Sequence, residues 1–180
     1  MKILAISGSA RINSTNTAML RAIQSIAPAN IEISVFDRVG ELPVFSPDLE
    51  ILPLPRQVQG FIDAIARSDG LIVASPEYVR SIPAGLKNAI DWLVSGAEIV
   101  HKPIALLHAS HRGDDMLANL RTVLATVSDR FAVDIFLRLH LMKMEPAEIL
   151  GAMETPENRS KVEAYLRALA LFCMAERESA

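Results

Sequence analysis

Short apolar runs alternate five times with longer stripes of apolar residues at helical spacing along this 180-residue chain. The runs are apolar on both faces, which is typical of strands in a parallel sheet with helices on both sides. We expect these strands in residues 3–6, 31–36, 71–74, 103–107 and 131–141. The helical stripes fall in residues 16–26, 54–65, 83–93, 115–127 and 155–172. The alternation therefore predicts an α/β fold.

The order of the strands follows from the handedness of the connections between them. Crossovers between parallel strands are right-handed, which leaves few topologies for five strands. We expect the doubly wound order 2-1-3-4-5, with ligands bound beyond the carboxyl ends of the first and third strands. Hydrophobic residues make up 51% of the chain, which is enough for a full core. Because no linker or repeat divides the sequence, we predict one domain over residues 1–180.

Charge and cysteine content argue against several classes of protein. The net charge is −3 and the basic residues are scattered, whereas a nucleic-acid surface needs clustered Lys and Arg. Cys173 is the one cysteine, which excludes an internal disulfide, and the four histidines lack the spacing of metal ligands. The apolar run at the start is too short for a signal-peptide core or a membrane span. We therefore expect a cytoplasmic protein without a metal site.

The loop after the first predicted strand, residues 8–16, has the composition of a phosphate site. Gly8 permits a tight turn, and Arg11 offers a forked cation suited to a phosphate. The helix that follows adds free backbone N–H groups, and hydroxyl donors come from Ser9, Ser14 and Thr15. The G-x-G-x-x-G and Walker patterns are both absent. The alternative interpretation is a helix-capping loop, rich in Ser and Asn, that binds nothing.

The loop after the third predicted strand, here called the ring loop (residues 75–83), reads Ser-Pro-Glu-Tyr-Val-Arg-Ser-Ile-Pro. It leads into Leu-Lys-Asn-Ala-Ile-Asp-Trp, which begins at Leu86. Together with Gly-Ser-x-Arg-x-x-Ser-x-Asn in the first loop and the stretch from Leu42 to Glu50, this segment resembles the NADPH-dependent FMN reductases. That family includes flavin, quinone, azo-dye and chromate reductases. The resemblance covers most of the chain up to about the fifth strand, and it implies a flavodoxin-like fold.

The resemblance also implies an FMN site built from three loops. The first loop of the family holds the FMN phosphate and its approach, which here means Ser9, Arg11, Ser14, Thr15 and Asn16. The isoalloxazine ring lies along the ring loop, which here offers Pro76, Glu77, Tyr78, Ser81 and the backbone N–H of Val79. A third loop, after the fourth strand, supplies Ser110 and Gly113. A homodimer or homotetramer is implied as well, with the helix from Pro83 near the subunit contact.

Two places depart from the family pattern. Val79 stands where the family usually has Asn, so this side chain offers no hydrogen bond. In the third loop, the usual glycine pair is replaced by Asp114 and Asp115. Carboxylates at that position would oppose negative charge on a reduced flavin. We expect Asp114 instead to cap the next helix, because helix N-termini favour acids.

The resemblance implies an oxidoreductase that passes electrons from NADPH or NADH through FMN to a small acceptor, in a ping-pong order. No side chain need act as nucleophile or base. Arg80, Arg112 and His111 flank the expected site and are candidates for contact with NADPH or an anionic acceptor; the alternative is ordinary surface residues. Two other functions stay open: a flavodoxin-like electron carrier, which the weak net charge disfavours, and a non-catalytic descendant of the family.

Overall fold

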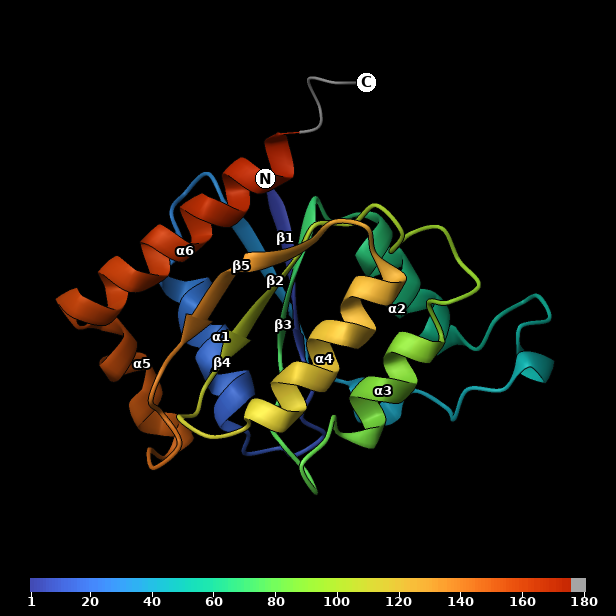
Figure 1. The fold of residues 1–180 in the computed structure, drawn as a ribbon, viewed down its shortest axis with the longest axis horizontal. Helices are drawn as coiled ribbons and strands as arrows, with labels where there is room; N and C mark the ends of the chain where they lie inside the picture. The colour runs from blue at the N-terminus through green and yellow to red at the C-terminus, as the bar shows by residue number, and fades with distance from the viewer. Residues whose placement is uncertain (176–180) are drawn as a thin grey trace.

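A computed structural model describes residues 1–175 and shows a five-stranded sheet between two layers of helices (Figure 1). The strands are β1 (Lys2–Ser7), β2 (Glu32–Phe36), β3 (Gly70–Ala74), β4 (Ile104–His108) and β5 (Phe131–Arg138). The α-helices are α1 (Thr15–Ile26), α2 (Arg56–Ala66), α3 (Ala84–Asp91), α4 (Asp114–Val127), α5 (Pro146–Glu154) and α6 (Pro156–Met174).

All strand pairs of the sheet are parallel, and their order is β2-β1-β3-β4-β5. The predicted order 2-1-3-4-5 is therefore confirmed. Alternate residues of β1 face opposite layers: Ile3 and Ala5 pack with α1, α5 and α6, whereas Leu4 and Ile6 pack with α2, α3 and α4. Because both faces are buried, the strands read as continuous apolar runs in the sequence.

The helix α5 was not expected, and the fifth strand is shorter than predicted. The strand ends at Arg138 and the chain then turns into α5, which begins with a capping box between Glu145 and Glu148. Only Ile149 and Met153 of this helix are buried. Two apolar positions four residues apart are too few to distinguish a helix from a loop by periodicity.

The stretch between β2 and α2 projects from the body of the molecule, to the right in Figure 1. It contains two 3₁₀ turns, Val39–Glu41 and Pro47–Leu49. Its base is fixed to α3, because the Asn88 Oδ1 accepts the Phe45 N–H at 2.7 Å. The indole N–H of Trp92 likewise donates to the Pro43 carbonyl at 2.8 Å. Trp92 is buried, so it serves the core of this chain.

The carboxyl ends of the strands meet at one edge of the sheet, where the loops after β1, β3 and β4 converge. Parallel pairing of β1 with β3 and of β3 with β4 brings these loops together, although they are far apart in the sequence. This edge is where open α/β sheets bind ligands. Among residues 1–175, no helix is both long and apolar enough to cross a membrane.

Candidate functional site

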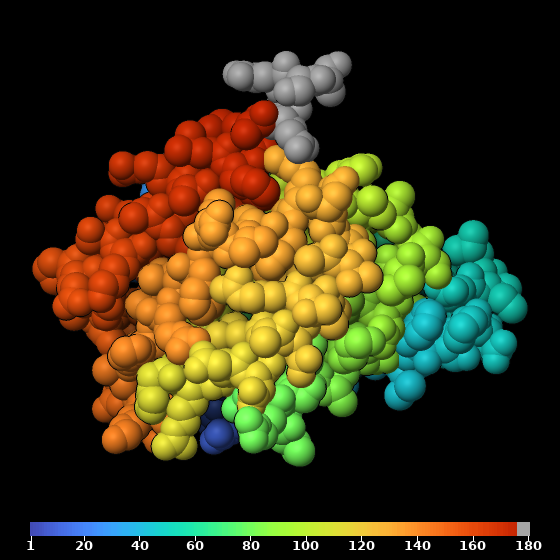
Figure 2. Space-filling model, viewed as in Figure 1, coloured from blue at the N-terminus to red at the C-terminus, as the bar shows by residue number. Residues whose placement is uncertain are grey.

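A cleft of about 380 Å³ lies at the carboxyl edge of the sheet, within the size range of small-molecule sites. Figure 2 shows part of the first loop, in dark blue, between the loops after β3 in green and after β4 in yellow. The cleft is lined from these loops and from one residue after β5: Arg11, Thr15, Asn16, Ser75, Pro76, Glu77, His108, Ala109, Ser110, Arg112, Gly113 and Met142.

The first loop presents hydrogen-bond donors at the start of α1. Ser14 is the N-cap: its Oγ accepts the Thr17 N–H at 3.3 Å, so the hydroxyl proton stays free to donate. The Ser14 carbonyl accepts the Ala18 N–H, which leaves the amides of Thr15 and Asn16 at the open end of the helix. These amides and the helix dipole favour an anion.

The backbone of this loop is held by hydrogen bonds of Gly8 and Ser9, whereas, among the described residues, the side chain of Arg11 is left free. Gly8 donates its N–H to the Ala74 carbonyl at 2.7 Å, and a Cβ there would lie 2.7 Å from the Leu86 Cδ2. A larger residue at this position would therefore displace the Leu86 side chain. Ser9 is buried and accepts the Arg11 N–H at 3.2 Å, while the Arg11 side chain is exposed. Within residues 1–175 the Arg11 guanidinium forms no ion pair.

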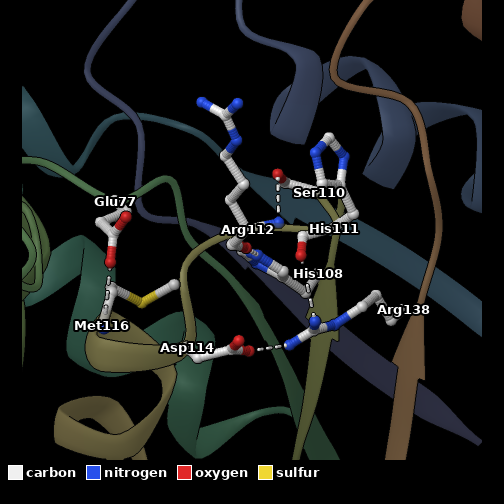
Figure 3. Close-up of polar contacts among 8 residues, drawn as sticks. All are labelled: Glu77, His108, Ser110, His111, Arg112, Asp114, Met116 and Arg138. Carbon is white, nitrogen blue, oxygen red and sulfur yellow. Dashed lines mark hydrogen bonds and ion pairs between the residues drawn. The ribbon is translucent and has the colours of Figure 1, made fainter.

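The ring loop forms the wall of the cleft next to α4. The Glu77 carboxylate accepts the backbone N–H of Met116 at 3.3 Å, as Figure 3 shows, and so caps the first turn of α4 from a different segment. At its tip the loop makes a tight turn, because Tyr78 and Ser81 exchange two backbone hydrogen bonds. Between them Val79 and Arg80 have φ angles of 51° and 57°, a conformation that β-branched residues rarely adopt.

The third loop begins α4 differently from our expectation for Asp114. The N-cap is Gly113, whose φ is 100°, and no side chain caps this end from within the helix. Asp114 is the first helical residue, and its carboxylate binds the Arg138 guanidinium at 2.5 Å (Figure 3). This contact lowers the pKa of Asp114. The capping prediction is therefore wrong, although an acid in the first turn still suits the helix dipole.

His108 was missed as a site residue. It is the last residue of β4 and is buried, and its Nε2–H donates to the Arg112 carbonyl at 2.5 Å. Burial lowers the pKa of His108, so the neutral imidazole is the form that supports the loop. The place of His108 at the end of an apolar strand, beside the third loop, was the available signal.

The structure brings eight of the predicted site residues into the cleft: Arg11, Thr15, Asn16, Pro76, Glu77, Ser110, Arg112 and Gly113. The other predicted residues do not line it: Ser9, Ser14, Tyr78, Val79, Arg80, Ser81 and His111. The lining residues that sequence reasoning did not name are Ser75, His108, Ala109 and Met142. Val79 is 99% exposed at the tip of the ring loop, outside the lining of the cleft.

The donor set of the cleft suits a phosphate monoester that also carries hydroxyl groups. Free amides at the start of α1, the Ser14 hydroxyl beside them and the Arg11 guanidinium supply donors to the phosphate. Asn16 is 7% exposed, and its buried Oδ1 has no hydrogen-bond partner within the described part of the chain. A buried acceptor without a partner costs stability, and a hydroxyl donor from a ligand would relieve that cost.

Comparison with known proteins adds a family and a set of relatives. The family model for NADPH-dependent FMN reductase matches residues 1–136. A quinone reductase of Escherichia coli K12 is 31% identical over 113 residues, which are 61% of this chain and 60% of that protein. An NAD(P)H-dependent FMN reductase of Pseudomonas aeruginosa is 38% identical over 112 residues, again 61% and 60% of the two chains. The matched part thus spans about three fifths of these relatives.

Solved structures show the same fold. FerB, a flavoenzyme NAD(P)H:(acceptor) oxidoreductase from Paracoccus denitrificans, superposes with a TM-score of 0.75 at 24% identity. The superposition covers 94% of this chain and 97% of FerB. An NADH:FMN oxidoreductase in its apo form gives a TM-score of 0.63 at 22% identity. At these identities the likeness supports the flavodoxin-like architecture.

Proposed function

This chain belongs to the NADPH-dependent FMN reductase family, and we propose that it is an FMN-dependent oxidoreductase that moves electrons from NADPH or NADH to a small acceptor. The observation that carries the proposal is the cleft at the carboxyl edge of the sheet. It combines an anion-binding helix start with a free arginine and an unpartnered buried acceptor. The acceptor would be a flavin, a quinone, an azo compound or a metal oxyanion.

The first loop would hold the phosphate of FMN. The amides of Thr15 and Asn16 and the hydroxyl of Ser14 lie at the start of α1, where the helix dipole favours a negative group. Arg11 would close the site from the solvent side, while Ser9 keeps the backbone of Arg11 in place. The Asn16 Oδ1 would accept a hydrogen bond from a hydroxyl of the ribityl chain.

The ring loop and the third loop would both contact the flavin ring. Pro76 and Glu77 line the cleft from the ring loop, with the backbone of Tyr78, Val79 and Ser81 beyond them. Ser110 and Gly113 line it from the third loop, and Gly113 lies next to Glu77. When bound, FMN supplies the redox chemistry: it takes a hydride from a nicotinamide and returns electrons to an acceptor. Both substrates would use the same open side of the cleft in turn, which predicts ping-pong kinetics.

Arg112 is the cation best placed to meet an anionic substrate. It lines the cleft, its side chain extends away from Asp114 in Figure 3, and it forms no ion pair within residues 1–175. His111 is exposed next to it and would contact a substrate only at the rim. Arg80 points its guanidinium to Asp115 instead, at 2.5 Å.

Self-association as a homodimer or homotetramer is part of the proposal. The projecting stretch before α2 exposes four large apolar side chains: Val44, Leu49, Ile51 and Leu52. A cluster of this kind is typical of a protein–protein contact. Size-exclusion chromatography with light scattering would give the mass, and Ile51→Glu should dissociate the oligomer. Leu171→Glu, at an exposed position on α6, is the matched control.

A cytoplasmic location is also part of the proposal, and cell fractionation would test it.

The decisive test of function is an absorbance spectrum of the purified protein with FMN, followed by NADPH and then NADH without oxygen. Bound flavin that either nicotinamide bleaches would establish the reductase half-reaction. If neither nicotinamide reduces the bound flavin, the proposed reductase activity is refuted and an electron carrier is favoured. A protein that binds no FMN would be a non-catalytic descendant of the family.

A further inference from the structure

The tip of the ring loop is held in a strained conformation by its surroundings. Val79 and Arg80 both lie in the left-handed region, and neither is a glycine or asparagine. Such strain persists only where neighbouring contacts over-determine it. Val79 is 99% exposed, so its own side chain makes no such contact. The contacts must come from the paired backbone of Tyr78 and Ser81 and from Arg80.

Arg80 connects this tip to α4 across the outside of the cleft. Its Nε lies 2.5 Å from the Asp115 Oδ2, and Asp115 is in the first turn of α4. The neighbouring contact from Glu77 to the Met116 N–H runs between the same two elements at 3.3 Å. Two adjacent residues of α4 therefore bind two residues of the ring loop that are three positions apart.

We propose that Arg80 and Asp115 are a positioning pair: together with Glu77 they hold the ring loop against α4, and so fix one wall of the cleft before any ligand enters. The benefit to FMN binding rests on the proposed function, whereas the contact itself does not. A wall ordered in advance spares the ligand the entropy cost of ordering it.

The pair also accounts for an unusual feature of the sequence. Asp114 and Asp115 replace a glycine pair that is usual in the family, and each acid has an arginine partner from a different element. Asp114 binds Arg138 from β5, and Asp115 binds Arg80 from the ring loop. The two carboxylates therefore connect the start of α4 to β5 and to the ring loop, and each negative charge is paired with an arginine.

Hydrogen exchange of the flavin-free protein tests the pair directly. Arg80→Gln and Asp115→Asn should each speed exchange of the Tyr78 and Ser81 amides by about 2- to 5-fold, the range of an exposed ion pair. The double variant should exchange no faster than the faster single variant, and Arg80→Lys should restore most of the protection. In 1 M salt the native protein should approach the Arg80→Gln rate. Arg67→Gln, which removes an exposed ion pair on α2, is the control.

The same variants separate this inference from the proposed function. FMN affinity, measured by flavin fluorescence, should fall by a similar factor in both single variants and recover in Arg80→Lys. Unchanged exchange in both single variants, or effects that add in the double variant, would overturn the pair. Faster exchange with unchanged FMN affinity would overturn its role in positioning the wall. If the native protein binds no FMN, the proposed function fails, and the exchange rates still decide whether the pair exists.

Discussion

Although Gly113→Ala adds only one methyl group, it should destabilise the folded protein and distort the cleft. Gly113 has a φ of 100°, and a Cβ there would lie 2.9 Å from the His108 Nε2 and 3.0 Å from its Cε1. The neighbour is a buried ring rather than the flexible end of a side chain. The substitution therefore strains the backbone and displaces the imidazole from the Arg112 carbonyl at the same time.

The expected loss of stability is the sum of three effects. A non-glycine residue in this backbone region costs about 1–3 kcal/mol. Weakening the hydrogen bond from His108 to the Arg112 carbonyl costs about 0.5–1.5 kcal/mol. Alanine also restricts the unfolded chain, which returns about 0.4–1 kcal/mol. We expect a net loss of about 0.5–4 kcal/mol, with a central value of about 2 kcal/mol that lowers Tm by about 4–8 °C for a chain of this size.

Thermal and urea unfolding of Gly113→Ala beside Gly60→Ala would measure the effect. Gly60 lies within α2, and a Cβ there would have no atom within 4 Å. The same substitution should therefore stabilise the protein by about 0.5–1 kcal/mol at this position. FMN affinity should fall in Gly113→Ala alone. A Gly113→Ala protein within about 0.5 kcal/mol of the native stability would refute both the strain and the contact with His108.

Three further predictions concern the loops of the cleft. Arg11→Ala should weaken FMN binding by about 1.5–3 kcal/mol, the range of a charge-assisted hydrogen bond, and titration calorimetry that finds native affinity would remove Arg11 from the phosphate site. Val79→Asn should raise stability by about 1 kcal/mol, because Asn tolerates a positive φ and the exposed Val side chain makes no contact to lose; a urea midpoint at or below the native value would contradict this. Burial lowers the pKa of His108. Below about pH 6.5 the imidazole therefore takes up a proton in the unfolded chain but not in the folded protein. The free energy of unfolding of the native protein decreases as the pH is lowered through this range. The stability advantage of the native protein over His108→Gln should therefore be larger at pH 7.5 than at pH 5.5, and an equal difference at both values would disprove the linkage.

The sheet could be predicted because burial on both faces left an unambiguous signal. Residues such as Ile3 and Ile72 lie in continuous apolar runs, and right-handed crossovers then fixed the strand order. The helix α5 left no such signal. It contacts α1 and buries only Ile149 and Met153, so most of its residues face solvent and show no helical period. Periodicity identifies an element in proportion to the apolar area that the element buries.

The site was predictable where a short motif carries its own chemistry. Arg11, Asn16 and Glu77 lie in segments whose residue types suit a phosphate or a ring, and the structure brings all three into one cleft. His108 and Met142 lie outside any motif. They reach the cleft because β4 pairs with β3 and β5, and this neighbourhood exists only after the sheet has formed.

The departures from the family pattern show the limit of reading positions one at a time. Taken alone, Asp115 places a carboxylate beside the proposed flavin site, and Val79 and Arg80 occupy a turn that favours other residues. In the folded chain the Arg80 guanidinium binds the Asp115 carboxylate, and Arg80 lies in the strained turn of the ring loop. A substitution that is unfavourable at one position is thus explained by a residue 35 positions away. Asp115→Gly should therefore free Arg80 and loosen the ring loop.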